Sequence, residues 1–568
     1  MFKSIYLFLI KFVSPNTKKK IFKLQLLCLV NLLNEFINVS FIYSFLLSLF
    51  NNGSASKINQ IFLEYFKITF NSYSGAILLI SVFFISNFFI IYLNYKIYKY
   101  SELICNEVSA NYYRTILNAQ YEKFIILHPA EIIKKLNSEM PLISHGIFQP
   151  LLMFFSKLLI LFALSIFLAL TFSYKVIFIM LFIFLIYLII FFSIQKITYY
   201  YGKKVSLLLS SINKVLYETF NNFQIISLHN LKSYFYNSYK TDLDSQSLVK
   251  SLGYLISQSP KTIIETLSFS IMIIIFVYFG LDNSNTVNLY IPILATIAFV
   301  GYRILPVGQQ LYLSIILIKN SFYVLSTINK DFEYLSIKTQ YKKEEIEKKN
   351  IIKDIKTLQL KNIFFKYKQD NKFIIKNFNY NFKKDNIYLI SADSGKGKTT
   401  LINVIMGFLK QQKGTILVNK KNYSESYHEN IKKFISYFPQ ATFLFDANLY
   451  ENTTLEFNSQ YKNLEKFKNS LKEANLLKEL SGYLNNKNQL TGHKGSKLSG
   501  GQIQRISISR IFYNPKKIII LDEPTNNLDE FNKKIILRNI YKLKKDRILI
   551  ILSHDKKIIP FVDKVIYL

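Results

Sequence analysis

The chain has 568 residues, of which half are hydrophobic and 16% aromatic, and its formal net charge is +35. The length leaves room for several domains, and the charge does not indicate a nucleic-acid partner, because the lysines form neither one stripe nor a known binding motif. Only two cysteines are present, Cys28 and Cys105, so the sequence predicts neither a disulfide framework nor a cysteine metal site.

The N-terminal half contains six apolar spans that are long enough to cross a bilayer. They cover roughly residues 24–50, 76–93, 151–172, 176–194, 262–280 and 291–317. Two long connections, residues 94–150 and 195–261, carry many basic residues, so we expect them and the N-terminus to lie in the cytoplasm. Because these connections are almost free of Pro and Gly, we expect the spanning helices to continue into the cytoplasm and to turn at tips that touch the soluble half.

The segment after the first span and the division of the chain into domains can also be predicted. After the first span, apolar residues at helical spacing predict a short amphipathic helix, either on the outer membrane boundary or packed as a cap on neighbouring spans. Its apolar positions are Ile58, Ile61, Phe62, Tyr65 and Phe66. We expect a transmembrane domain over residues 1–329, a polar linker over 330–357 and an α/β domain over 358–568, where short apolar strands alternate with helical segments.

A phosphate-binding loop is predicted after an apolar strand at residues 387–390. The following residues match G-x-x-x-x-G-K-[ST], except that Ala392 replaces the first glycine. Backbone N–H groups of such a loop, and of the helix after it, surround the phosphates of a nucleotide. The expected contacts come from Ser394, Gly395, Lys396, Gly397, Lys398, Thr399 and Thr400. Lys398 would reach the β- and γ-phosphates, and the Thr399 hydroxyl would bind Mg²⁺.

Two more motifs accompany this loop. A strand over residues 518–521 ends in Asp522, which can orient Mg²⁺, and Glu523, which can act as general base for the attacking water. The segment Leu498-Ser499-Gly500-Gly501-Gln502 opens a predicted helix, where backbone N–H groups can approach a phosphate that another subunit holds. The motifs together predict an α/β P-loop ATPase that binds ATP with Mg²⁺ and acts as a dimer.

In this order, the motifs resemble the ATP-binding-cassette (ABC) ATPases over residues 358–568. The resemblance implies that Tyr367 stacks on adenine and that Gln440 senses Mg²⁺, the water and the membrane loops. It implies that Asp529 contributes to the dimer contact and that His554 contacts the γ-phosphate. It also implies a homodimer with two sites, each joining Lys398 of one subunit to Ser499 of the other. One departure is His493, where exporters of the family usually carry an acidic residue.

Six spans followed by this ATPase resemble an exporter-type half-transporter. This implies an α-helical transmembrane domain with long cytoplasmic extensions, and a place in a bacterial inner membrane with the ATPase in the cytoplasm. Charged residues inside spans are costly and are therefore candidate substrate sites. They are Arg303 in the sixth span, Glu35 in the first, and Lys261 and Glu265 at the start of the fifth. Either Arg303 pairs internally with Glu35 or Glu265, or it belongs to a basic cavity that accepts an anionic headgroup such as pyrophosphate.

The spans further resemble the flippases of lipid-linked oligosaccharides. The resemblance rests on Tyr302-Arg303, Pro260-Lys261, residues 121–124 and 221–223, and the external helix. It implies that a polyprenyl-pyrophosphate-linked glycan is the substrate, although Gln310 stands where the family carries a basic residue. The alternatives are a lipid, multidrug or peptide exporter and, in another class, an ATP-gated channel or regulator. The intact Glu523, His554 and LSGGQ segment count against the channel.

Overall fold

The computed structural model describes residues 2–50, 72–171, 174–280, 287–336, 354–367, 372–391, 395–422, 430–457, 463–486 and 489–568. The predicted external helix around Phe62 lies outside these residues. The chain divides into two compact units. One comprises Met1–Ala119 and Lys123–Ile337, and the other comprises Gln120–Glu122 and Lys338–Leu568.

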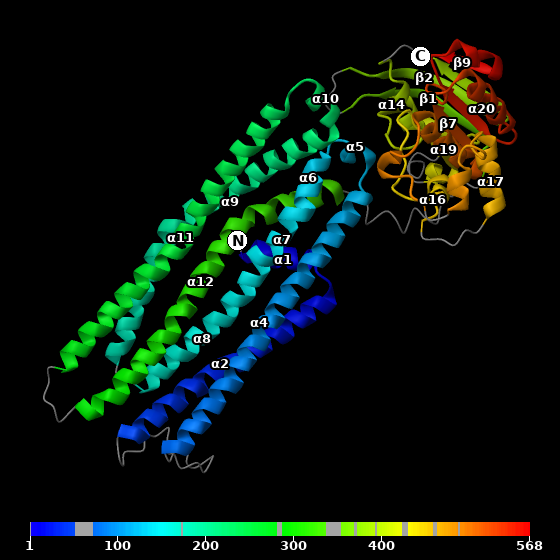
Figure 1. Ribbon diagram of the computed structural model, residues 1–568. Helices are drawn as coiled ribbons and strands as arrows, with labels where there is room; N and C mark the ends of the chain where they lie inside the picture. Colours follow the sequence, from blue (N-terminus) through cyan, green and yellow to red (C-terminus); the bar gives the residue numbers. More distant parts are fainter. Residues whose placement is uncertain are drawn as a thin grey trace. The chain divides into compact units, whose positions relative to one another are not determined.

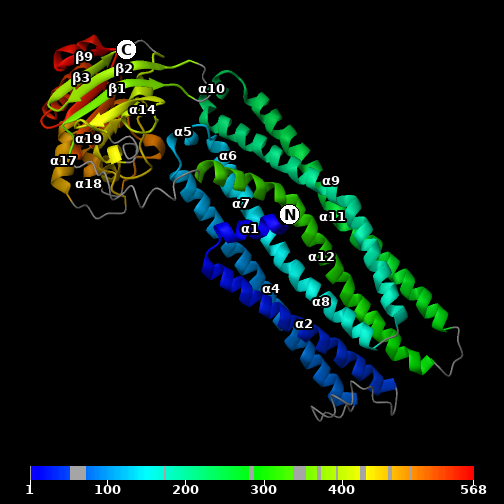
Figure 2. The same ribbon diagram turned by 180° about the vertical axis from the view of Figure 1, so that it is seen from behind.

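The first unit is built from long helices, each of which contains one predicted span. They are α2 (Pro15–Phe50), α4 (Ser72–Leu117), α8 (Gln149–Thr171), α9 (Tyr174–Asn221), α11 (Lys232–Gly280) and α12 (Val287–Ser336). Within this unit α2 packs on α4 and α8, α9 on α11, and α12 on α8 (Figures 1 and 2). The predicted continuation of the spans as helices is confirmed, because α4, α9 and α11 extend well beyond the apolar stretches.

Shorter elements are also found among the described residues of this part of the chain. They are α1 (Phe2–Phe12), α5 (Tyr121–Phe124), α6 (Pro129–Lys134), α7 (Met140–Ile143), α10 (Phe223–Leu228) and two π-helical segments, η1 (Lys135–Glu139) and η2 (Ser144–Phe148). The helix α12 continues to Ser336, into the segment predicted as a linker.

Four helical stretches among the described residues are long and apolar enough to cross a membrane. They are Pro15–Leu46, Gly75–Leu117, Pro129–Thr171 and Ala295–Leu335. The two other predicted spans lie in α9 and α11, whose side chains are described only in part. On α4, Phe84, Ile85 and Phe88 are more than 70% exposed. A helix that presents large apolar side chains outward in this way suits a lipid environment.

The second unit contains an antiparallel and a parallel sheet. The antiparallel sheet has the strand order β2-β1-β4-β5, with β1 (Thr357–Phe365), β2 (Ile375–Lys383), β4 (Lys413–Val418) and β5 (Lys421–Asn422). The parallel sheet has the order β6-β7-β8-β3-β9, with β6 (Ile435–Phe438), β7 (Ile518–Asp522), β8 (Ile548–Leu552), β3 (Asn386–Ser391) and β9 (Lys564–Tyr567). Helices over this unit are α14 (Lys398–Ile405), α16 (Leu449–Thr454), α17 (Leu464–Glu473), α18 (Ser481–Asn485), α19 (Gly500–Tyr513) and α20 (Glu530–Lys542), with 3₁₀ turns η3 (Ile431–Phe434), η4 (His493–Gly495) and η5 (Lys556–Phe561).

The parallel sheet is covered on both faces, which explains why its central strands are uninterrupted apolar runs. Every residue of β7 and β8 is buried. Successive residues of β7 alternate between two cores: Ile518 and Ile520 face one, whereas Ile519 and Leu521 face the other. The predicted fold class, a helical transmembrane domain with an α/β ATPase domain, is confirmed.

Candidate nucleotide site

The predicted motifs meet at one edge of the parallel sheet. Strands β3, β6, β7 and β8 are hydrogen-bonded in parallel, so their carboxyl ends lie along the same edge. The chain leaves these ends into the phosphate loop, Gln440, Asp522-Glu523 and Ser553-His554, respectively. Ligands of open parallel sheets bind outside this edge, so the topology alone brings together residues that are far apart in the sequence.

The phosphate loop has the backbone that its glycines allow. Gly395 and Gly397 have φ angles of +82° and +85°, in the left-handed region that favours glycine. A Cβ atom on Gly397 would lie 2.7 Å from Cγ2 of Ile374, so no larger residue fits there without movement. Helix α14 begins at Lys398, directly after the loop, so its N-terminal N–H groups are available to a phosphate. Ser394 and Ala392 lie outside the described residues.

Two buried carboxylates stand side by side at the end of β7. Asp522 and Glu523 are each 6% exposed. Burial, followed by repulsion from Glu523, raises the pKa of Asp522, although Lys398 and the Tyr437 hydroxyl oppose the shift. Adjacent buried carboxylates of this kind favour a bound cation. Mg²⁺ usually binds one or two carboxylates together with substrate phosphates, so Asp522 and the exposed Thr399 fit its requirements.

Lys398, His554 and Glu523 form the polar cluster at this edge. The Lys398 ammonium lies 2.6 Å from Nε2 of His554, which can accept its hydrogen bond when the imidazole is neutral. The same Nε2 lies 3.5 Å from Oε1 of Glu523. The structure therefore brings together a predicted phosphate ligand, a predicted γ-phosphate contact and the predicted base.

The Leu498–Gln502 segment forms the N-terminus of α19, as the motif predicts. Ser499 is the N-cap: its hydroxyl accepts from the Gln502 N–H at 3.3 Å, and the Gln502 side-chain oxygen accepts from the Ser499 N–H at 3.1 Å. Gly500 has nothing near the position of a Cβ atom, and the closest group to Gly501 is the Asn527 carbonyl at 3.5 Å. The result is an exposed helix N-terminus that an incoming phosphate can approach.

The remaining predicted nucleotide residues stand on different elements. Tyr367 is half-buried and meets the Phe365 ring edge-on, with 5.2 Å between centroids. Gln440 is exposed just after β6. Asp529 is the N-cap of α20, and the hydrogen bond that it accepts from Asn532 at 2.6 Å lowers its pKa. The roles of these three residues stay predictions from the motifs, as do those of Thr400, which is buried, and of Lys396 and His493, which are exposed.

The charged residues of the transmembrane unit form a second cluster. Nη1 of Arg303 donates to both carboxylate oxygens of Glu35, at 2.9 Å each. The guanidinium also lies 5.5 Å from the ring centroids of Phe83 and Phe299. The structure therefore shows Arg303 in an internal pair with Glu35, and its role toward a substrate stays a prediction.

One member of this cluster was missed by the sequence reasoning. Lys157 on α8 interacts electrostatically with both Glu35 and Arg303. The available signal was a single lysine within an otherwise apolar span. The side chain of Lys261, which was expected to contribute, lies outside the described residues, although its backbone is part of α11.

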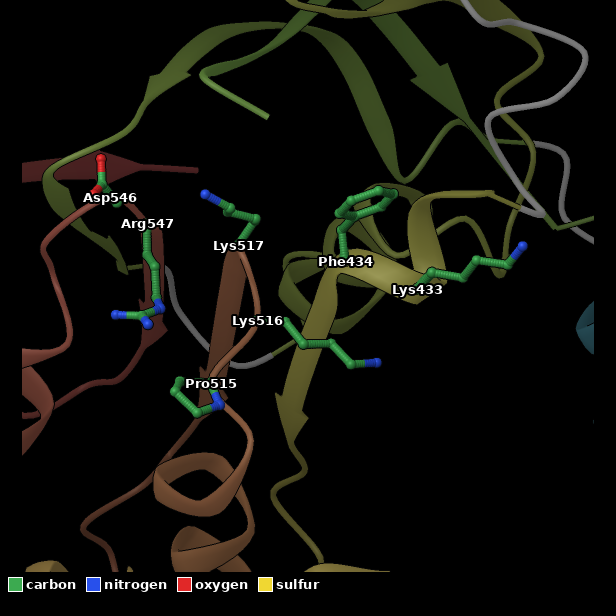
Figure 3. A pocket seen from close by; sticks show the side chains of 7 residues that line it. All are labelled: Lys433, Phe434, Pro515, Lys516, Lys517, Asp546 and Arg547. Atoms are coloured by element: carbon green, nitrogen blue, oxygen red, sulfur yellow. The ribbon is translucent and has the colours of Figure 1, made fainter. Parts of the chain in front are cut away.

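A cavity of about 230 Å³ lies at the opposite edge of the parallel sheet. Figure 3 shows its basic side chains, Lys433, Lys516, Lys517 and Arg547, together with Phe434. These residues precede β6, β7 and β8, whereas the phosphate loop and the catalytic candidates follow the strands. The cavity is therefore not the nucleotide site.

Comparisons with known proteins agree with a transmembrane unit that is followed by an ATPase unit. Residues 375–526 match the family model of the ABC transporter, and residues 24–302 match that of the ABC transporter transmembrane region. A "Probable ABC transporter ATP-binding/permease protein" of Haemophilus influenzae is 30% identical over 227 residues, which are 39% of this chain and 40% of that protein. A "Putative export ATP-binding/permease protein" of Rickettsia typhi is 29% identical over 86% of this chain and 83% of its own length.

The fold is also similar to that of a solved structure. A bacterial Atm1-family ABC exporter with ATP bound superimposes with a TM-score of 0.79, at 13% sequence identity, over 97% of this chain and 93% of that one. At this identity the likeness concerns the fold alone.

Proposed function

This chain is an ABC exporter half-transporter, with a transmembrane region followed by an ATP-hydrolysing cassette, and from this premise we propose that two copies form a flippase in a bacterial inner membrane. The proposed substrate is a polyprenyl-pyrophosphate-linked oligosaccharide, moved from the cytoplasmic to the outer leaflet. Each ATP would lie between the phosphate loop of one copy and the Ser499 helix of the other. The exposed N-terminus of α19 supports this arrangement, because a phosphate from outside the chain can approach the backbone at Gly500 and Gly501.

The nucleotide chemistry follows from the residues at the sheet edge. Glu523 takes a proton from the attacking water, and His554 contacts the γ-phosphate. Lys398, which contacts His554 in this structure, neutralises phosphate charge when ATP is present. Mg²⁺, held by Asp522 and Thr399 with Gln440 nearby, would supply charge neutralisation at the phosphates.

The observation that carries the substrate proposal is the charge of the intramembrane cluster. Among the described residues that form it, the cluster has two basic side chains, Arg303 and Lys157, and one acidic side chain, Glu35. Ionisable side chains inside a membrane domain are costly and mark a functional site. A pyrophosphate headgroup would place its negative charge beside these two basic groups, and a guanidinium offers it several donors in a fixed geometry.

The test uses the full-length protein reconstituted in vesicles with a fluorescent pyrophosphate-linked glycolipid. We expect Arg303→Ala and Lys157→Ala each to slow flipping about tenfold to hundredfold, the value of a lost charge-assisted hydrogen bond, while basal ATPase persists. Lys99→Ala, which removes an exposed lysine of α4, is the matched control and should flip normally. Normal flipping by both cluster variants would overturn the headgroup site. Parental protein that moves apolar dyes or lipids but not the glycolipid would favour a multidrug or lipid exporter.

A second measurement separates a transporter from an ATP-gated channel or regulator. The buried Glu523 beside Asp522 supports true hydrolysis, so the parental protein in lipid should turn ATP over. Glu523→Gln should slow turnover about 10²- to 10⁴-fold, the usual contribution of a general base, and should trap ATP on the protein. ATP binding without turnover by the parental protein would favour the channel, and parental turnover by Glu523→Gln would refute Glu523 as the base.

A further inference from the structure

A serine lies beside the proposed general base because of the register of two strands. Strands β7 and β8 pair in parallel with Asp522 opposite Leu552, and the Glu523 N–H donates to the Leu552 carbonyl at 2.9 Å. Ser553, the residue that follows β8, therefore lies next to Glu523 at the end of the sheet. Ser553 is 1% exposed and Glu523 6%, so neither side chain is well solvated.

The hydrogen bonds of Ser553 fix the direction of its hydroxyl. Its Oγ accepts from the Asp555 N–H at 3.1 Å and lies 3.2 Å from Oε2 of Glu523. An ionised carboxylate can only accept, and a serine hydroxyl has one hydrogen to give. The hydroxyl hydrogen therefore points at Oε2, while the Asp555 N–H occupies the acceptor side.

This contact gives the two carboxylate oxygens of Glu523 different partners. Oε2 receives the Ser553 hydroxyl, whereas Oε1 faces His554 at 3.5 Å. The backbone of Glu523 is itself held in the left-handed region, with φ at +51°, a conformation that costs free energy for a residue with a Cβ atom and persists only where the surroundings impose it. The backbone of Glu523 and one of its carboxylate oxygens are therefore both held by their surroundings.

We propose that Ser553 is a positioning residue for hydrolysis: its hydroxyl holds Oε2 of Glu523, so that Oε1 is the oxygen that takes the proton of the attacking water. This rests on the proposed role of Glu523 as general base. In the step, the water oxygen bonds to the γ-phosphorus, the bond from that phosphorus to the bridging oxygen of ADP breaks, and one water proton passes to Oε1. The products are ADP and inorganic phosphate. Ser553 exchanges no proton and acts only through Glu523.

The test compares serine variants of the full-length protein in lipid, in two backgrounds. Ser553→Ala should lower kcat for ATP about 10- to 100-fold, part of what a general base supplies, while KM for ATP stays within about threefold. Ser553→Cys has a side chain of similar size but a much weaker donor, so its kcat should also decrease. This variant replaces the alanine variant in the test if the alanine variant does not fold. Ser470→Ala is the matched control, because Ser470 is equally buried but donates to the Phe467 carbonyl on α17; its kcat should stay parental.

The second background distinguishes positioning from a general loss of structure. If Ser553 acts through Glu523, then Ser553→Ala should cause no further loss of single-turnover rate in a Glu523→Gln protein, because residues that act as a unit are not additive. A kcat within about twofold of the Ser470→Ala control, or an equal loss in both backgrounds, would overturn the proposal. Parental turnover by Glu523→Gln alone would instead refute the general base.

Discussion

At the scale of single residues, one ion pair anchors the helix that carries the LSGGQ segment. The guanidinium of Arg505 on α19 donates to both carboxylate oxygens of Glu479, at 2.6 and 2.7 Å, and also to the Asn475 carbonyl at 2.8 Å. A bidentate pair of this kind fixes orientation as well as distance. It links the first turns of α19 to the loop before α18, so it holds the exposed Ser499 end in place.

This pair predicts a specific acid sensitivity. The hydrogen bond from Arg505 lowers the pKa of Glu479, so the folded state favours the ionised carboxylate. Its stabilisation is therefore complete above the pKa of the unfolded chain, about 4, and is lost as pH falls through the folded value. We expect Glu479→Gln to lower the melting temperature of the cassette transition at pH 7 and to converge with the parental protein at lower pH. Thermal denaturation across this range measures it; a constant difference at every pH would contradict the assignment.

At the scale of elements, two helices of the cassette begin with the same capping box. In α19, Ser499 and Gln502 exchange hydrogen bonds; in α16, Asn448 and Glu451 do so at 2.8 and 3.3 Å. Each box satisfies N–H groups that a helix start leaves without partners. The local chemistry is therefore shared, but only α19 carries the Gly-Gly segment of the proposed composite site. Variants at the two caps can therefore distinguish the contribution of an N-cap to stability from its contribution to ATP turnover.

We therefore expect Ser499→Ala and Asn448→Ala to destabilise the cassette similarly, each by about 1 kcal/mol, the usual value of an N-cap. Only Ser499→Ala should strongly reduce ATP turnover, because its hydroxyl and the N–H groups beside it would contact the nucleotide of the other copy. Denaturant unfolding gives the first quantity and steady-state ATPase the second. Equal loss of turnover in both variants would mean that the cap acts only through stability.

At the scale of the whole molecule, one unit carries the proposed substrate site and the other carries the proposed nucleotide site. The transmembrane unit carries its charge cluster on helices that are far apart in the chain, with Glu35 on α2, Lys157 on α8 and Arg303 on α12. The cassette collects the phosphate loop, the carboxylates and His554 at one sheet edge, while its LSGGQ segment caps an exposed helix. Each copy would thus offer both halves of a composite site, and an isologous dimer completes two such sites.

Mixed dimers test this composition directly. A Lys398→Ala copy paired with a Ser499→Ala copy should keep one intact site and therefore about half of the parental ATPase rate, whereas either variant alone should be inactive. The matched control places both changes on one copy and pairs it with a parental copy; this dimer should have no intact site. Co-expression with two affinity tags isolates each mixture. Activity in the control but not in the first mixture would show that each site lies within a single chain.

The sequence by itself determined the elements and the chemistry that local patterns encode. Apolar length defined the spans, since a bilayer requires about twenty such residues. The runs before Gly395 and before Asp522 identified β3 and β7, because parallel strands covered on both faces are continuously apolar. Glycine spacing identified the phosphate loop, because only certain residues permit a backbone with positive φ.

Only the tertiary structure decided which side chains meet. Arg303 could have paired with Glu35 or Glu265, and the structure shows Glu35. Lys157 interacts with this pair only because α2, α8 and α12 pack together, which the sequence does not show. Ser553 became a partner of Glu523 through the register of β7 and β8, which a sequence does not display. Local periodicity depends on neighbours along the chain, whereas these contacts depend on how distant elements pack and align. Spacing therefore predicts helices, strands and loops, and packing selects the partners of their charges.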